Sequence, residues 1–280
     1  MIVSLNDILP IAQKKKYAIP AFNTFNLEVT QGILAAAEIE KSPVIISVSE
    51  KSIEYAGLLT IYQIIFSLAS KSKIPVVIHL DHGKLIELVQ QVIDQGFSSV
   101  MYDGSKLEFS ENIKNTAKVV NLAHRSDISV EGELGTIGGQ EDKTSSRNII
   151  YANPKDVLEF VDSTNVDALA VALGTSHGLP VRREHVDFDL LQAIRQICPI
   201  PLVLHGASNL SPKILTKAAK NGISKVNIDT ELRQGFTKGV REILDDKKLY
   251  DPRAYLSEGR LEIKKIAARI INILGSNNKA

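Results

Sequence analysis

Three histidines that follow apolar runs are the first candidates for chemistry in this 280-residue chain. His82 lies in PVVIHLDHG (75–83), His177 in ALGTSHG (172–178) and His205 in PLVLHGAS (201–208). Neutral imidazoles are good ligands for Zn²⁺, and three of them leave one coordination position open for a substrate. Any one of these histidines alone is more often a structural residue, whereas the three together predict a catalytic metal site.

Asp81 directly precedes His82 and is the main candidate for acid–base chemistry. A carboxylate in this position either orients a metal ligand or acts as general acid/base on a bound substrate. The remaining histidines have blander interpretations. His79 lies further back in its strand and is expected to support the site or the core, and we expect His124 and His185 to be structural or solvated.

Further polar residues follow the other apolar runs and are expected to face the same pocket. They are Asn23, Ser49, Asp103, Glu131, Glu133, Gln140, Glu141, Asp142, Asn227, Asp229 and Thr230. Asp103 and Glu133 follow neighbouring runs. They are equally compatible with a second cation site and with hydrogen bonds to the backbone of a lid.

Two late segments have the form of an anion site. Gly206, Ala207 and Ser208 lead into a helix that starts at SPKIL, and NIDTEL (227–232) opens the next helix. Backbone N–H groups at helix N-termini after the last two strands of a barrel commonly bind phosphate. The alternative is that Ser211 and Thr230 are ordinary helix caps, and both interpretations can hold together.

The pattern of apolar runs predicts the fold. Strands are expected at 17–22, 43–48, 75–80, 99–102, 128–134, 167–173, 201–204 and 223–228, and helices at 27–40, 58–70, 84–95, 109–123, 154–163, 188–197, 212–221 and 231–245. Eight strands alternating with eight helices are typical of a (β/α)₈ barrel. An open doubly wound sheet is less favoured, because no glycine-rich phosphate loop follows the first strand.

Additional segments complete a single domain that spans 1–280. We expect an extra N-terminal helix at 4–16, an extra C-terminal helix at 257–274 and a frayed end at 275–280. The connections 135–153 and 174–187 are unusually long and are interpreted as lids on the catalytic face, with Gly138 and Gly139 as hinges. For 143–148 a disordered insertion is the alternative.

Composition narrows the class of protein. The net charge is +1 with well-mixed acidic and basic residues, so nothing indicates a nucleic-acid or membrane surface. The single cysteine, Cys198, cannot form an internal disulfide and lies among apolar residues. The N-terminal stretch lacks the pattern of a signal peptide, and no apolar run reaches the ~20 residues of a membrane helix. We therefore expect a cytoplasmic protein.

Several dispersed motifs resemble a known family. HLDHG, VEGELGTIGGQED, VALGTSHG, LVLHGAS, KVNIDTELR and DPRAYL are similar, in this order, to the class II (zinc-dependent) fructose-bisphosphate aldolases and to the related tagatose-bisphosphate aldolases. The resemblance extends from residue 20 to residue 253. It implies a (β/α)₈ barrel, a homodimer or homotetramer, and a lyase. The implied reaction is reversible cleavage of a ketose 1,6-bisphosphate into dihydroxyacetone phosphate and glyceraldehyde 3-phosphate.

The resemblance also implies roles for individual residues. His82, His177 and His205 correspond to the zinc ligands, Asp81 to the acid/base at the C4 hydroxyl, and Glu141 to the residue that moves the proton of the dihydroxyacetone phosphate carbon. Asp103 and Glu133 correspond to a secondary cation site, divalent or monovalent. The implied substrate and phosphate ligands are Asn23, Ser49, Gly178, Gly206, Ser208, Asn227, Asp229, Thr230 and, reaching a neighbouring subunit's site, Arg253.

One departure affects the choice of substrate. Many fructose-type members continue after the loop histidine with glycine, a small residue, tyrosine and lysine, whereas this chain reads HGLPVRR (177–183). Tagatose-type relatives also lack that lysine, and Arg182 or Arg183 is a possible replacement for its charge. Three other functions stay open at this point: a Schiff-base aldolase using Lys225, a zinc hydrolase, and a non-catalytic subunit.

Overall fold

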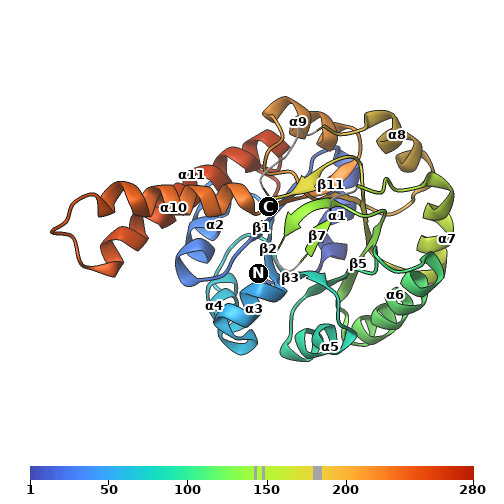
Figure 1. Ribbon diagram of the computed structural model, residues 1–280, viewed down its shortest axis with the longest axis horizontal. Helices are drawn as coiled ribbons and strands as arrows, with labels where there is room; N and C mark the ends of the chain where they lie inside the picture. The colour runs from blue at the N-terminus through green and yellow to red at the C-terminus, as the bar shows by residue number, and fades with distance from the viewer. Residues whose placement is uncertain (142–143, 147–148, 179–184) are drawn as a thin grey trace.

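The computed structural model describes residues 1–141, 144–146, 149–178 and 185–280. Eight parallel strands close into a barrel in the order β1-β11-β10-β8-β5-β4-β3-β2 (Figure 1). Their bounds are β1 Ile19–Asn23, β2 Val44–Ser49, β3 Val76–Gly83, β4 Ser99–Tyr102, β5 Ser129–Leu134, β8 Ala168–Val171, β10 Leu202–Leu204 and β11 Ile223–Ile228. Each expected strand is present, and the predicted (β/α)₈ barrel is confirmed.

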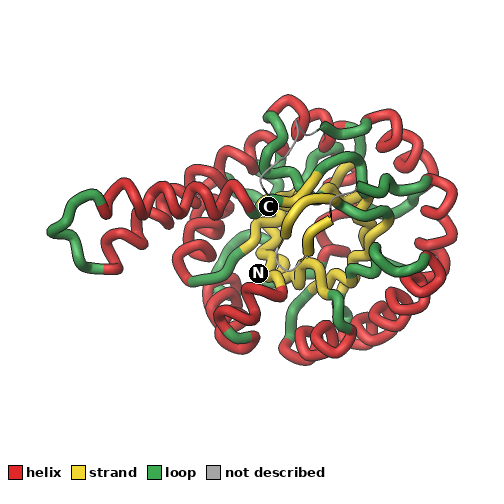
Figure 2. Tube along the Cα trace, viewed as in Figure 1, coloured by secondary structure: helices red, strands yellow, loops and turns green. Residues whose placement is uncertain are grey.

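A ring of helices surrounds the barrel (Figure 2). The helices that follow the barrel strands are α2 Leu27–Ile39, α4 Leu58–Ala69, α5 Ile86–Gln95, α6 Phe109–Ala123, α7 Pro154–Thr164, α8 Phe188–Ile197, α9 Pro212–Lys220 and α10 Thr230–Leu244. A short helix, α3 Glu50–Ala56, and the 3-10 turn His124–Ser126 were not expected from the sequence. Ser49 caps α3 by accepting from the backbone N–H of Ser52, a local signal of helix initiation.

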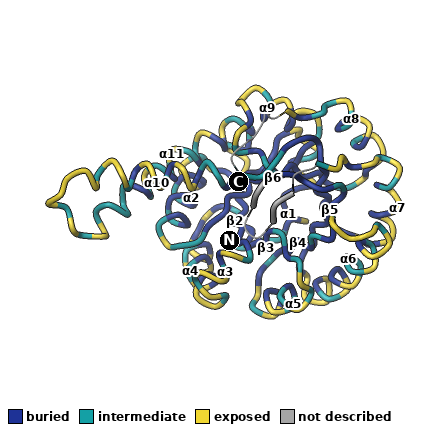
Figure 3. The backbone as a smooth tube through the Cα atoms, in the orientation of Figure 1, coloured by how far each residue is buried: buried dark blue, intermediate teal, exposed yellow. Residues whose placement is uncertain are grey.

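The extra N-terminal helix, α1 Leu5–Lys15, closes the bottom of the barrel. Its buried residues Leu5, Ile8, Leu9 and Ala12 pack in one cluster with side chains from the strands, among them Ile45, Val77 and Met101. Asp7 accepts a hydrogen bond from the backbone N–H of Ser4 at 2.7 Å, which completes the N-terminal cap. Figure 3 shows the strands buried inside the ring, while the outer faces of the helices are exposed. The end of the barrel next to α1 is thus filled with apolar side chains. The candidate residues lie at the other end, here called the upper end, where the strands have their carboxyl ends.

The extra C-terminal helix, α11 Pro252–Leu274, forms an arm with α10 that projects beyond the barrel (Figure 1). The chain after α11, where a frayed end is expected, makes backbone hydrogen bonds to the end of α2. Backbone N–H groups of Asn278 and Lys279 donate to the carbonyl oxygens of Glu40 and Lys41 at 2.8 and 3.0 Å. These contacts with the end of α2 hold the final residues in place.

The two long loops meet in a small three-stranded sheet of order β7-β6-β9. Strands β6 Gly138–Glu141 and β7 Thr144–Ser146 come from the loop after β5, and β9 Ser176–His177 comes from the loop after β8. Gly138 pairs with Ser176 and Gly139 with His177 in parallel register. The segment that includes the proposed proton donor Glu141 is therefore hydrogen-bonded to the segment that contains His177.

Among the described helices, none is by itself both long and apolar enough to cross a membrane. Within the described part of the chain, one pair of consecutive helices, α3 and α4, is together long and apolar enough, but the two are bent by 98° relative to each other.

Candidate metal centre and active site

The end of β3 brings two adjacent side chains, Asp81 and His82, close together, with Asp81 Oδ1 3.9 Å from His82 Nε2. Neighbouring residues on a regular strand point to opposite faces, so Asp81 and His82 require an irregular backbone to share a site. The β3–β4 register shifts between Leu80 and Gly83, and His82 has a left-handed φ of 51°. A non-glycine residue in this region is uncommon and costs roughly 1–3 kcal/mol. The bulge explains how one strand supplies both a carboxylate and a possible metal ligand.

The three histidines predicted as ligands lie together at the upper end of the barrel. Each offers a nitrogen, and these nitrogens all lie within 4.8 Å of one another. His82 Nε2 is 2.8 Å from His205 Nδ1, and the ring centroids of His82 and His177 are 5.0 Å apart. Thr175 Oγ1 donates to the backbone oxygen of His205 at 2.7 Å and so ties the loop of His177 to β10. The set has the donors and the spacing of a three-histidine metal site.

The other nitrogen of His82 faces two acids. Nδ1 lies 3.2 Å from Asp103 Oδ2 and 3.7 Å from Glu133 Oε2, and these three residues form a second group that could hold a cation. A neutral imidazole has one lone-pair nitrogen. A metal on Nε2 therefore leaves Nδ1 as an N–H donor to Asp103, and the two groups compete for His82.

Burial and charge shift the pKa values of these groups in opposite directions. Burial alone would raise the pKa of Asp103, but the hydrogen bonds from His82 and Ser105 outweigh it and lower the pKa. The pKa of Glu133 lies well above its ordinary value because the side chain is buried beside the Asp103 carboxylate. The pKa of His205 is lowered by burial and by His82 and Lys225. A neutral His205 is the form that binds a metal.

Two asparagine amides hold Asp81. Asn23 Nδ2 donates to Asp81 Oδ2 at 2.8 Å, and Asn227 Nδ2 donates to Oδ1 at 3.0 Å. The Oδ1 atoms of both asparagines are buried and accept no hydrogen bond from the described residues. Buried acceptors without donors are rare in proteins, so these atoms are candidates for contact with a ligand.

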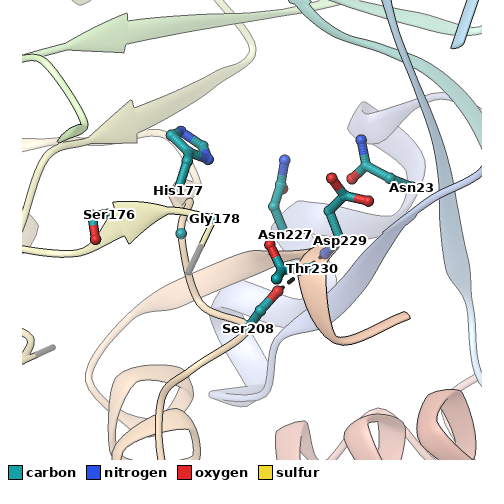
Figure 4. A pocket seen from close by; sticks show the side chains of 9 residues that line it. Asn23, Ser176, His177, Gly178, Ser208, Asn227, Asp229 and Thr230 are labelled. Atoms are coloured by element: carbon teal, nitrogen blue, oxygen red, sulfur yellow. Dashed lines mark hydrogen bonds between the residues drawn. The ribbon is translucent and has the colours of Figure 1, made fainter. Parts of the chain in front are cut away.

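The pocket in Figure 4 lies beside this constellation. It is lined by Asn23, Ser176, His177, Gly178, Gly206, Ser208, Asn227, Asp229 and Thr230. His177 lies on one side and Asn23 on the other, with Ser208 and Thr230 between them near the start of α10. Ser208 Oγ accepts from the backbone N–H of Asp229 at 3.2 Å. Seven of the nine residues that the resemblance assigned to substrate binding are thus brought together.

Ser211 and Thr230 are expected from the sequence to be ordinary helix caps, and only Ser211 has this role. Ser211 caps α9 by accepting from the backbone N–H of Ile214 at 3.4 Å. The expectation that Thr230 caps α10 was wrong, because Asp229 is the N-cap residue and its side chain accepts no capping bond. The Asp229 carboxylate instead pairs with Arg233, with Oδ2 2.7 Å from the guanidinium.

Two expected substrate ligands lie elsewhere. Ser49 is the cap of α3 and does not line the pocket. Arg253 is in the first turn of α11, at the outer end of the arm, where its side chain is 92% exposed and pairs with Asp251. Arg182 and Arg183 lie outside the described residues, as does Asp142, and only the backbone of Glu141 is described.

The remaining histidines agree with their blander interpretations. His79 is fully buried, and its Nδ1 lies 2.9 Å from Ser99 Oγ. His124 pairs with Asp167 at 2.8 Å on the exposed side, and His185 Nε2 lies 3.4 Å from the Tyr151 hydroxyl.

Sequence reasoning assigned no role to Glu131, whose Oε1 lies 2.8 Å from His205 Nε2. A signal was available. Glu131 and Glu133 are two residues apart on β5, as are Lys225 and Asn227 on β11, so each pair shares the inner face of the barrel. A charged residue two positions before a polar residue at the end of a strand should therefore also point into the barrel, next to the site.

The fold and the site define a barrel enzyme whose chemistry takes place at the carboxyl ends of the strands. The family described as fructose-bisphosphate aldolase class-II matches residues 3–279. The chain belongs to this metal-dependent family.

Individual relatives agree with this assignment. The chain is 44% identical to a fructose-bisphosphate aldolase of Geobacillus stearothermophilus over 100% of this chain and 99% of that protein, and 42% identical, with the same coverage, to one of Staphylococcus aureus strain N315. Among solved structures, the YdjI aldolase of Escherichia coli K12 is 34% identical with a TM-score of 0.91, and both chains are covered completely. The fructose-bisphosphate aldolase of Campylobacter jejuni is 26% identical with a TM-score of 0.85, over 100% of this chain and 97% of that one.

Gly206 joins two of the proposed ligands, and its replacement tests their arrangement. It has a φ of +64°, and a Cβ there would lie 2.6 Å from the backbone oxygen of Ser176, next to His177. We expect Gly206→Ala to separate His177 from His205 and to reduce bound metal per subunit, measured by elemental analysis after dialysis. Gly57→Ala is the control, because Gly57 has a φ of +81° but a Cβ there would meet only Thr60 Oγ1, at an ordinary contact distance of 3.7 Å. Equal metal content in both variants would contradict this account.

Proposed function

We propose that this protein catalyses the reversible aldol cleavage of a ketose 1,6-bisphosphate, with fructose 1,6-bisphosphate favoured, to dihydroxyacetone phosphate and glyceraldehyde 3-phosphate. The observation that carries the proposal is the position of Asp81. It lies beside three clustered imidazoles, with Oδ1 3.9 Å from His82 Nε2, and is held by two buried amides. Family membership and relatives named fructose-bisphosphate aldolase support the same reaction.

We propose that His82, His177 and His205 hold one zinc ion per subunit. Three imidazole nitrogens that lie within 4.8 Å of one another suit this ion, and burial, which lowers the pKa of His205, favours the neutral form of that ligand. When bound, zinc would act as a Lewis acid that stabilises the negative charge developing on the ketone oxygen. Asp103 would accept a hydrogen bond from the Nδ1–H group of His82. When His82 does not bind zinc, Asp103 and Glu133 would instead hold a second cation, divalent or monovalent.

The residues of the chain divide the proton transfers. Asp81 takes the proton of the C4 hydroxyl while the C3–C4 bond breaks, which leaves an aldehyde and an enediolate. Glu141, in the sheet segment paired with the strand of His177, is proposed to give a proton to C3 of the enediolate. Asn23 and Asn227 keep the Asp81 carboxylate in place through both steps.

The pocket at the start of α10 is proposed to bind the phosphate of the dihydroxyacetone phosphate half. Gly178, Gly206 and Ser208 line it, together with the N-terminal turn of the helix, whose backbone N–H groups favour an anion. Ser49 does not line this pocket, but it pairs in register with Asp81 at the end of the neighbouring strand, and on that ground it is proposed as a ligand for the rest of the sugar.

Arg253 is proposed to serve the site of a neighbouring subunit, because it lies at the outer end of the arm. We therefore propose that the active protein is a homodimer or homotetramer, and we expect it in the cytoplasm.

Lys225 argues against the Schiff-base alternative. Such a lysine has to reach the substrate as a free amine. Lys225 is fully buried, and its Nζ lies 2.7 Å from Glu131 Oε2. The lysine is therefore engaged below the site rather than presented to a substrate.

The choice between fructose and tagatose bisphosphates depends on the segment after Gly178, which lacks the tyrosine and lysine of many fructose-type members. We expect cleavage of fructose 1,6-bisphosphate to exceed that of tagatose 1,6-bisphosphate, and both to be abolished by a chelator and restored by zinc. A coupled assay for dihydroxyacetone phosphate measures this. Chelator-resistant cleavage that traps with borohydride would contradict the metal site, and phosphate release without aldol cleavage would indicate a hydrolase.

Asp81 gives a second test. Asp81→Ala removes the base at the C4 hydroxyl but leaves the three histidines, so kcat should fall about 10²–10⁴-fold while zinc content is unchanged. The exposed Asp94, replaced in the same way, should have no effect. Asp81→Ala with the activity of the unaltered enzyme would eliminate Asp81 as the acid/base.

A further inference from the structure

A buried ion pair lies directly below the proposed metal centre. Glu131 and Lys225 are both fully buried, on the inner faces of β5 and β11. Glu131 Oε2 lies 2.7 Å from Lys225 Nζ, and Oε1 lies 2.8 Å from His205 Nε2. The carboxylate therefore bridges an ammonium group and the imidazole of a proposed zinc ligand.

The neighbouring strand positions show that a barrel does not need this pair for packing. Met101 pairs in register with Glu131 and Val203 with Lys225, and both are buried apolar residues of the interior. Replacement of a buried ion pair by apolar residues is often neutral or stabilising, because burying two charges carries a desolvation cost. The pair is thus poorly explained by stability, and its contact with His205 is the feature that apolar residues would lack.

The contacts determine which nitrogen His205 presents. A carboxylate accepts hydrogen bonds, so the Nε2–H group of His205 donates a hydrogen bond to Glu131. The lone pair of the neutral imidazole ring therefore lies on Nδ1. Nδ1 faces His82 Nε2 at 2.8 Å, within the group of nitrogens proposed to bind zinc. Lys225 holds the second carboxylate oxygen, and it in turn approaches His79 Nε2 at 3.4 Å. The side chain of Glu131 is fixed at both oxygens.

We propose that Glu131 and Lys225 are positioning residues that orient His205 to bind the metal through Nδ1. Glu131 accepts the Nε2 proton of His205, and Lys225 keeps the carboxylate turned toward it. This inference rests on the proposed role of His205 as a metal ligand. Removal of such a partner typically weakens metal binding about 10–100-fold.

Two double variants that differ only in the side chain at position 131 test the proposal. In Glu131→Gln/Lys225→Met the amide can turn its oxygen toward His205, because the second donor is gone. In Glu131→Leu/Lys225→Met residue 131 is similar in size but has no acceptor. The zinc dissociation constant of each is measured by competition with a chelator. We expect the first to bind nearly as tightly as the unaltered protein and the second about 10–100-fold more weakly.

The single variant Glu131→Gln completes the set. The amide at position 131 in this variant has one oxygen, so it cannot present an oxygen to both His205 and Lys225. One of these two residues then faces the NH₂ group. Zinc binding should therefore be weaker than in Glu131→Gln/Lys225→Met, where the amide oxygen can face His205. Nitrogen-15 NMR of the metal-free protein provides an independent readout. The unaltered protein should have the His205 proton on Nε2, whereas the leucine variant should show a mixture of tautomers.

The outcomes separate this inference from the proposed function. Zinc affinity that is unchanged in His205→Ala would overturn the metal site itself. Loss of zinc in His205→Ala together with equal affinities in the two double variants would overturn the positioning role alone. Thermal unfolding of the metal-free variants serves as the control for folding. A purely structural pair predicts lower stability with unchanged affinity, which is also a contradicting result.

Discussion

The need to pair every charge buried inside a closed barrel dominates this structure. Apolar side chains fill most of the lower interior, which α1 covers. Above it, Lys225, Glu131 and His205 form a chain of contacts of 2.7 and 2.8 Å, and His82 with Asp103 continues it on the far side of the proposed metal position. Each group in this chain has a partner, and the histidines remain with nitrogens directed at one another. Imidazole nitrogens that converge in this way suit a divalent cation.

The sequence predicts the barrel well because apolar runs of four to eight residues are a strong signal for buried parallel strands. The histidines could be found for the same reason, since each follows such a run. What the pattern could not show is the bulge at Asp81 and His82, which depends on a shift of register between two strands. The short helix α3 and the sheet that joins the two long loops were also missed. The helix α3 depends on a local cap, and the small sheet depends on contacts between segments distant in the chain.

Roles that depend on distance were the hardest to predict. Ser49 and Asn23 both end a strand, yet Ser49 caps a helix while Asn23 holds Asp81. The spacing of Glu131 and Glu133 puts Glu131 on the inner face of the barrel, but its role follows only from its 2.8 Å contact with His205. We expect the choice of sugar to depend on Gly178–Arg183, and the substrate comparison tests this, because residues 179–184 fall outside the described part of the chain.

The central claim is that three histidines from β3, β9 and the end of β10 bind one metal ion. X-ray absorption at the zinc edge of the zinc-loaded protein tests it most directly, because imidazole rings give a characteristic multiple-scattering pattern. The account predicts nitrogen and oxygen as the only atoms bound to zinc, with the signal of three imidazoles, reduced to two in His177→Ala. A sulfur neighbour, or an imidazole signal unchanged in His177→Ala, would contradict it.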